Sequence, residues 1–226
     1  MSSTPRGNFP ISQAFDASDL SANPFLYRAV ELIEQVHACG PLPTVIFKHA
    51  PSASELEYRP AFPPQIVIDS AGRHKLPMMI HCIGHLIDQF GLGSGGYDSF
   101  ESRKLRGAKY SGPLSDWWVA VHGTETVRTL YFAMDDPPRL KSSIKGTEII
   151  PEKMDLAYLV SAEELWARSY LQYITVKTND PVLTAFLKTT LDQKAFTLFE
   201  QWPAREFTAI EVQIDALFAR LGWRQG

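Results

Sequence analysis

Two histidines one helical turn apart are the residues of this sequence whose types and spacing indicate chemistry most clearly. His81 and His85 lie in the stretch HCIGHLID, residues 81–88. On a helix, positions four apart lie on the same face, so the two imidazole rings can converge on one metal ion. Asp88 lies on that face too, where an aspartate can accept the second ring N–H of a ligating histidine. The stretch therefore predicts a metal site with Asp88 as an outer partner.

The helix that carries this motif is expected to be buried. Most of its other positions between 75 and 90 are apolar, namely Met78, Met79, Ile80, Ile83, Leu86 and Ile87. Burying two histidines and a carboxylate costs free energy unless these groups are paired or bind something. Histidine pairs at this spacing also occur by chance, so a helical structural protein with merely buried histidines remains an alternative.

The motif resembles the active-site helix of gluzincin-type zinc metalloproteases, whose pattern is H-E-x-x-H. The form H-x-x-G-H-x-x-D is similar to that of anthrax lethal factor-like and related bacterial and phage-associated zincins. Their third zinc ligand is a glutamate on a later helix, in a stretch close to E-[FL]-[FW]-A-x-[AS]-[FY], and residues 164–170 read ELWARSY. The resemblance covers two short blocks, near 78–90 and 161–173. It implies Zn²⁺ held by His81, His85 and Glu164.

Two alternatives to this role of Glu164 remain open. Ser161 and Glu164 have the spacing of a capping box, in which the glutamate bonds to the backbone at the helix start. Glu163 is adjacent and could be the ligand instead. Helical periodicity favours Glu164, because the apolar residues that follow would flank it on a buried face.

Cys82 stands where the family has its general-base glutamate. That glutamate accepts a proton from water and later passes it to the leaving amine, and losing a general base costs about 10²–10⁴ in rate. The resemblance also implies a tyrosine before the third ligand that stabilises the oxyanion, and Tyr158 is the candidate. We therefore expect a zinc-dependent metallopeptidase-like protein that cleaves a protein substrate and is impaired or inactivated by Cys82.

Three explanations of Cys82 are compatible with the sequence. It could be a substitution introduced to inactivate an enzyme. The chain could instead be a natural pseudoenzyme that keeps zinc for structure or for binding a peptide or partner. A natural enzyme could also take its base from elsewhere, with Glu163 as the candidate. A nucleophilic role for Cys82 is disfavoured, because burial in an apolar helix makes a thiol unreactive.

The elements that must position these residues are mostly helices. Helical periodicity or composition predicts helices at 24–39, 75–90, 116–134, 161–176, 181–201 and 206–221. Residues 44–49 and 65–69 are expected to be strands, and irregular structure is expected at 51–64, 91–112 and 139–157. By the resemblance, strand 65–69 would be the edge along which an extended peptide lies. The predicted fold class is α+β, a helix-rich zincin-like domain with a small early β-sheet.

The chain length suits one domain. Residues 1–23 are polar and rich in serine and proline, which predicts a flexible N-terminal arm. Residues 24–226 are then expected to form a single zincin-like metallopeptidase domain, because 226 residues, of which 45% are hydrophobic, can bury one core of useful size.

Composition also narrows the expected partners. A net charge of −3 gives no reason to expect binding to nucleic acid, and no apolar run reaches the roughly 18 residues that span a bilayer. Two cysteines are too few for a disulfide framework, and the N-terminal residues lack the apolar stretch of a Sec signal peptide. We expect a cytoplasmic protein, or one exported by a specialised secretion system, whose partner is a protein or peptide substrate.

Overall fold

A helix-rich α+β fold with a small, early sheet is confirmed by the computed structural model, which describes residues 8–49, 57–68, 74–93, 99–106, 111–135, 153–192 and 201–224. Its helices are η1 (Ile11–Ala14), α1 (Ala17–Ala22), α2 (Pro24–Val36), α3 (Lys75–Leu86), η2 (Ile87–Leu92), η3 (Ser102–Arg106), α4 (Ser115–His122), α5 (Glu125–Asp135), α7 (Lys153–Leu159), α8 (Ala162–Thr178), α9 (Pro181–Asp192) and α10 (Ala204–Leu221). Its strands are β1 (Ile46–His49), β2 (Glu57–Arg59) and β3 (Gln65–Ile68).

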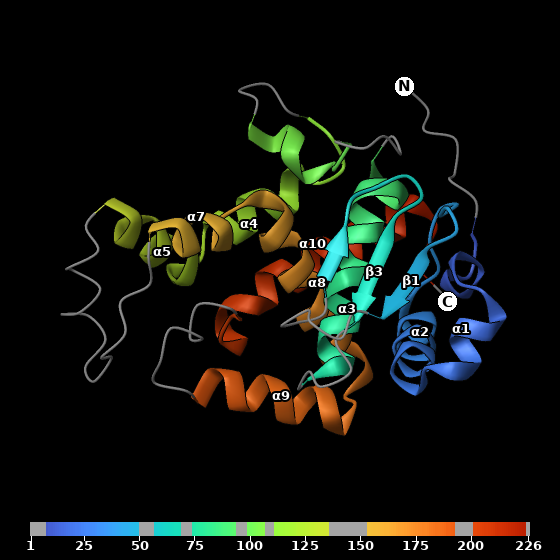
Figure 1. The fold of residues 1–226 in the computed structure, drawn as a ribbon. Coiled ribbons are helices and arrows are strands. Elements are labelled where there is room, and N and C mark those ends of the chain that lie inside the picture. Colours follow the sequence, from blue (N-terminus) through green and yellow to red (C-terminus); the bar gives the residue numbers. More distant parts are fainter. Residues whose placement is uncertain are drawn as a thin grey trace.

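Helix α3 lies at the centre of the fold, behind the sheet in the view of Figure 1. Its most extensive contact is with α8, and α2 packs against both helices. Gly84 makes this contact close, because a β-carbon at this position would lie 3.2 Å from the Ala167 Cα atom. The indole Nε1 of Trp166 donates a hydrogen bond of 3.0 Å to the Gly84 carbonyl. These contacts fix the position of α8 on the face of α3.

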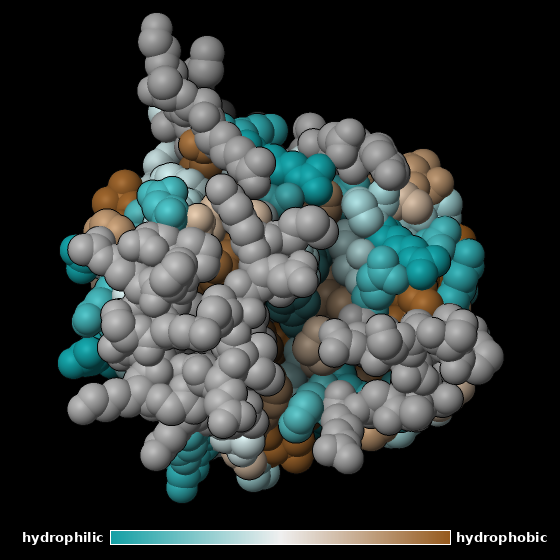
Figure 2. Space-filling view, turned by 60° about the vertical axis from the view of Figure 1, so that its left-hand side comes forward, coloured by the Kyte–Doolittle hydropathy of each residue, from teal (hydrophilic) through white to brown (hydrophobic). Residues whose placement is uncertain are grey.

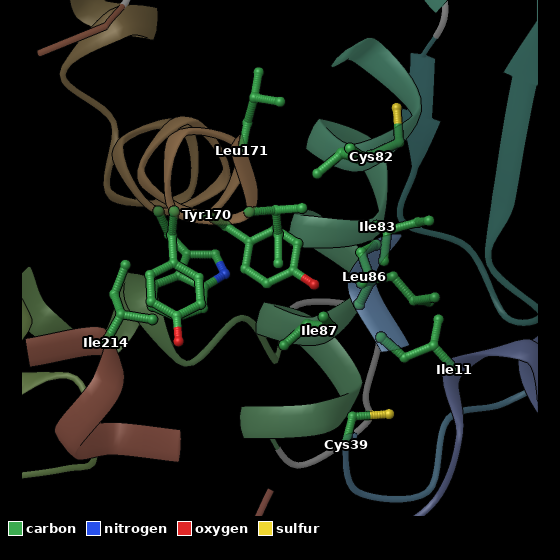
Figure 3. Packing of buried hydrophobic residues seen from close by; sticks show 14 of the residues in the cluster. Ile11, Cys39, Cys82, Ile83, Leu86, Ile87, Tyr170, Leu171 and Ile214 are labelled. Atoms are coloured by element: carbon green, nitrogen blue, oxygen red, sulfur yellow. The ribbon is translucent and has the colours of Figure 1, made fainter. Parts of the chain in front are cut away.

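One large hydrophobic core surrounds the two helices. Its members extend along the chain from Ile11 to Trp223. Figure 3 shows Ile83 and Leu86 of α3 and Ile87 of η2 beside Tyr170 of α8. A smaller cluster joins α5 and α7 and consists of Leu130, Ala133, Leu156, Leu159 and Val160.

The sheet has the strand order β1-β3-β2, with β1 parallel and β2 antiparallel to β3. The expectation that strand 65–69 is an edge is therefore wrong, because β3 is the central strand. The predicted loop 51–64 contains β2, whose Tyr58 is aligned with Ile66 of β3. Four prolines in this loop obscured a short polar–apolar–polar alternation that is typical of a strand.

The predicted helix starts at α2 and α8 are confirmed by their capping bonds. The Asn23 side chain accepts from the backbone N–H groups of Phe25 and Leu26, at 3.0 and 2.9 Å. The Ser161 hydroxyl accepts from the backbone N–H of Glu164, at 3.4 Å. Both caps satisfy donors that have no partner within the helix.

Two predictions about helix boundaries are wrong. The single helix expected at 116–134 is divided into α4 and α5, because Thr124 starts a new helix by accepting from the Val127 N–H at 3.2 Å. Helix α7 begins within the stretch expected to be irregular and ends two residues after it. Its apolar side chains pack on α5, a long-range contact that local composition does not reveal.

The prediction of a flexible arm at residues 1–23 is wrong from residue 8 onwards. Phe9 pairs with Cys39 in an isolated antiparallel bridge, and η1 and α1 follow it. Ile11, Ala14 and Phe15 are members of the main core. These few apolar residues anchor a polar segment to the core. The segment is therefore ordered, although its overall composition suggests flexibility.

The surface combines polar and apolar residues. On the face drawn in Figure 2, hydrophilic and hydrophobic residues alternate in small patches. Among the helices of the described residues, none has both the length and the hydropathy needed to cross a membrane.

We predict that Gly84→Ala destabilises the protein by up to about 2 kcal/mol. The added methyl group would lie 3.0 Å from Tyr170 Cδ1 and 3.2 Å from the Ala167 backbone, and overpacking of this kind costs about 1–3 kcal/mol. That cost exceeds the gain of about 1 kcal/mol in helix propensity. Urea unfolding of both proteins measures the difference. An alanine variant as stable as the wild type would show that α8 can move away from α3 without cost.

Candidate metal centre

His81, His85 and Glu164 come together between α3 and α8. The two Nε2 atoms of the histidines lie 3.1 Å apart. One Glu164 oxygen lies 3.4 Å from His81 Nε2 and the other lies 3.1 Å from His85 Nε2. All three residues are buried. The convergence predicted from the histidine spacing and from the two-block resemblance is present in the structure.

The spacing of these donor atoms suits a tetrahedral metal ion. Ligand atoms about 2.0–2.2 Å from a tetrahedral zinc lie about 3.4 Å from one another, close to the observed 3.1–3.4 Å. Two imidazoles and one carboxylate are also a donor set that zinc accepts while keeping a position open. The residues can therefore hold a metal ion, although the same geometry does not identify which ion.

The electrostatics of the cluster favour an ionised carboxylate. Burial opposes the charge on Glu164, but the charges and hydrogen bonds of His81 and His85 outweigh it and hold the pKa of Glu164 well below its ordinary value. A carboxylate that stays ionised beside two imidazole nitrogens offers a negative charge to a bound cation. This is the protonation state that metal binding requires of a carboxylate.

Glu164 and its neighbour Glu163 have separate roles in the structure. Glu164 points to the histidines, whereas the Glu163 carboxylate accepts from the Arg103 Nε at 2.9 Å. The choice between these two residues as third ligand is thus resolved by geometry in favour of Glu164. Glu164 does not close a capping box with its side chain, even though its backbone N–H is capped by Ser161.

The hydrogen-bond partner of Asp88 differs from the histidine that its position in the sequence predicts. Its carboxylate is fully buried but accepts from the backbone N–H and the hydroxyl of Ser102, at 2.9 and 2.5 Å. Within the described part of the chain, it has no hydrogen bond to His81 or His85. The predicted direct outer-partner role is therefore wrong, because the first residues of η3 offer Asp88 two donors that no local pattern reveals. Burial raises the pKa of Asp88 to about 7.

Two aromatic rings pack against the His85 imidazole. The Tyr58 ring stacks on the imidazole, with centroids 5.7 Å apart and planes at 18°. The Phe100 ring meets it edge-on at 6.3 Å. The Tyr58 hydroxyl donates to the Gln89 side chain at 2.6 Å, which fixes the tyrosine. Sequence reasoning missed these residues; the alternation in 57–59 was the one local signal for Tyr58.

Cys82 is buried in the core and does not belong to the donor cluster. In Figure 3 the Cys82 and Tyr170 side chains lie on different sides of α3. Burial raises the pKa of the Cys82 thiol well above its ordinary value, and the nearby Glu164 and Glu57 carboxylates raise it further. A thiol in this state holds its proton, so it is a poor general base.

Tyr158 lies at the site, as the resemblance implies. Burial of its hydroxyl end and the adjacent Glu164 carboxylate raise its pKa. The residue as a whole is 57% exposed. The Arg168 guanidinium holds α7 in place by donating to the Leu159 carbonyl. A tyrosine that remains protonated beside a ligand carboxylate can donate a hydrogen bond to a bound molecule.

We predict that Asp88→Asn changes how stability depends on pH. With a pKa of about 7 when folded and an ordinary value near 3.9 when unfolded, Asp88 binds more protons in the folded state between about pH 4 and 7. Its contribution is therefore fully present below about pH 4 and is lost as pH rises through 7. Asparagine carries no such dependence.

Urea unfolding at pH 5 and pH 7.5, with a chelator present, measures this effect. As pH rises, the free energy of unfolding of Asp88→Asn should increase relative to that of the wild type. If the free energies of unfolding of the two proteins change in parallel with pH, the pKa of Asp88 is not raised by folding.

Comparison of the chain with protein-family models, curated proteins and solved structures found no match. The resemblance to gluzincins therefore stays an expectation from the two sequence blocks, and the structure adds a His81, His85 and Glu164 cluster that could hold a metal ion.

Proposed function

We propose that this chain is a zinc-dependent, metallopeptidase-like protein whose peptide-bond hydrolysis is impaired by Cys82. The observation that carries the proposal is the convergence of three buried donors, at 3.1–3.4 Å from one another, on two helices. The same residues are those that the gluzincin pattern assigns to zinc. Bound zinc supplies Lewis-acid chemistry, polarising a carbonyl oxygen and increasing the acidity of water.

The chain's own residues would bind and orient the substrate. An extended peptide can pair with the outer edge of β2, since this strand is an edge of the sheet and its Tyr58 contacts His85. Tyr158, protonated beside Glu164, would donate a hydrogen bond to the substrate oxygen on which negative charge develops. These positions support a protein or peptide as the substrate class.

A second candidate function is that of a non-catalytic zinc protein that binds a peptide or partner. Two observations favour it. The Cys82 thiol is fully buried and holds its proton, and the alternative base Glu163 is paired with Arg103. A chain with the metal ligands but without an available base would bind a peptide without cutting it rapidly.

We predict one zinc ion per chain, bound by the three donors. His81→Ala and Glu164→Gln should each abolish stoichiometric zinc, because each removes one of the three protein ligands. His122→Ala is the control outside the donor set and should keep one zinc per chain. Elemental analysis after dialysis against zinc gives the result. A wild-type protein without metal would instead support a structural role for buried histidines.

Restoring the missing carboxylate separates the two candidate functions. We expect Cys82→Glu to raise chelator-sensitive cleavage of an unfolded protein such as casein by about 10²–10⁴, the usual contribution of a general base. Cys82→Gln has nearly the same shape without a base and serves as the control. A folded Cys82→Glu protein that binds zinc but cleaves neither casein nor a peptide library would favour the binding function.

A further inference from the structure

Within the described residues, His81 and His85 lack the outer hydrogen bond that metal-ligating histidines usually make. A ligating histidine nearly always donates its second ring N–H to a carboxylate, carbonyl or water, which fixes the ring. In the part of the chain that the structure describes, neither Nδ1 atom of His81 or His85 bonds to a protein group. His85 instead packs against the Tyr58 ring, nearly parallel to it, and the Phe100 ring, perpendicular to it. Its orientation depends on where these rings lie.

Phe100 belongs to a segment that is attached to Asp88. The buried Asp88 carboxylate accepts from the backbone N–H and the hydroxyl of Ser102. The backbone carbonyl of Asp88 accepts from the Glu101 N–H at 3.3 Å. Asp88 lies one turn after His85 and Ser102 lies two residues after Phe100. The carboxylate thus connects the end of the metal-bearing helix to the ring that touches its ligand.

The same segment also reaches the helix of the third ligand. The Arg103 guanidinium lies 4.5 Å from the centre of the Phe100 ring, and its Nε donates to Glu163 at 2.9 Å. Glu163 immediately precedes Glu164 at the start of α8. Arg103 therefore contacts the Phe100 ring and pairs with the carboxylate that precedes Glu164.

We propose that Asp88 is a positioning residue of the metal centre, which acts through Ser102 and Phe100 rather than through a bond to a ligand. The inference rests on the metal site proposed above. Without the Asp88 carboxylate, two donors at the start of η3 lose their acceptor and Phe100 loses its anchor. The His85 ring then has more orientations available, and metal binding must restrict them.

The experiment compares four variants of the full chain. Asp88→Ala removes the anchor, and Phe100→Leu removes the ring while keeping the anchor. Asp88→Asn keeps an acceptor for Ser102 and should rescue most of the loss. Lys104→Gln is the matched control, because Lys104 lies in the same segment but pairs with Glu101 and is half exposed.

Zinc affinity, measured by competition with a chelator, should fall about 10–100-fold in Asp88→Ala and Phe100→Leu, the range typical of outer partners of metal ligands. The visible absorption spectrum of the Co²⁺ form should change in these two variants and stay unchanged in Lys104→Gln. The spectrum reports coordination geometry, which a loss of stability alone does not alter.

Folded Asp88→Ala and Phe100→Leu proteins with wild-type zinc affinity and Co²⁺ spectra would overturn the proposal, as would an equal loss in Lys104→Gln. If Asp88→Ala does not fold, Phe100→Leu decides. If the wild type binds neither Zn²⁺ nor Co²⁺, the proposed function fails. The NMR shifts of the His85 ring protons in metal-free Asp88→Ala then test the positioning role, which requires them to move; unchanged shifts refute it.

Discussion

The backbones of α3 and α8 approach each other at Gly84, and the position of every donor atom depends on that approach. His81 and His85 flank Gly84 on one helix, while Glu164 stands one turn before Ala167 and Arg168 on the other. A larger residue at the contact would separate the helices, and the carboxylate would leave the histidines. The Trp166 bond to the Gly84 carbonyl sets the same contact from the side of α8.

Close packing of the two helices buries the Glu164 carboxylate, and a bound cation would compensate its negative charge. A buried carboxylate is costly unless it is paired, and Glu164 finds its partners in the two imidazoles. Without a metal, these partners must supply N–H groups to the carboxylate. With a divalent cation, all three groups become ligands and their protons are released. The cluster is therefore poised between a hydrogen-bonded arrangement and a metal-bound one, and protons compete with the metal for it.

The contrast between Glu164 and Cys82 separates metal binding from catalysis. The ligands lie where α3 and α8 meet, and their geometry does not depend on the residue at position 82. The thiol lies in the core with its proton retained, so it supplies no base. A cluster of this kind can therefore bind a metal ion whether or not a base is present at position 82. The aromatic shell of Tyr58 and Phe100 still holds His85 in the orientation that binding needs.

Local sequence patterns predicted which side chains share one face of a helix. They did not predict which side chains from distant segments of the chain pack against that helix. The spacing of His81 and His85 defines a shared face, and the Ser161 cap was visible in the sequence. Glu164 could be singled out through the second block of the resemblance. The partner of Asp88 lies 14 residues away in a segment without a periodic pattern, and long-range packing alone brings it there.

Anomalous diffraction at the zinc edge, from crystals grown with zinc, shows directly whether the three donors share one metal ion. We expect one peak at about 2.0–2.2 Å from His81 Nε2, His85 Nε2 and a Glu164 oxygen. Crystals without such a peak, in which the three side chains are hydrogen-bonded to one another, would contradict it.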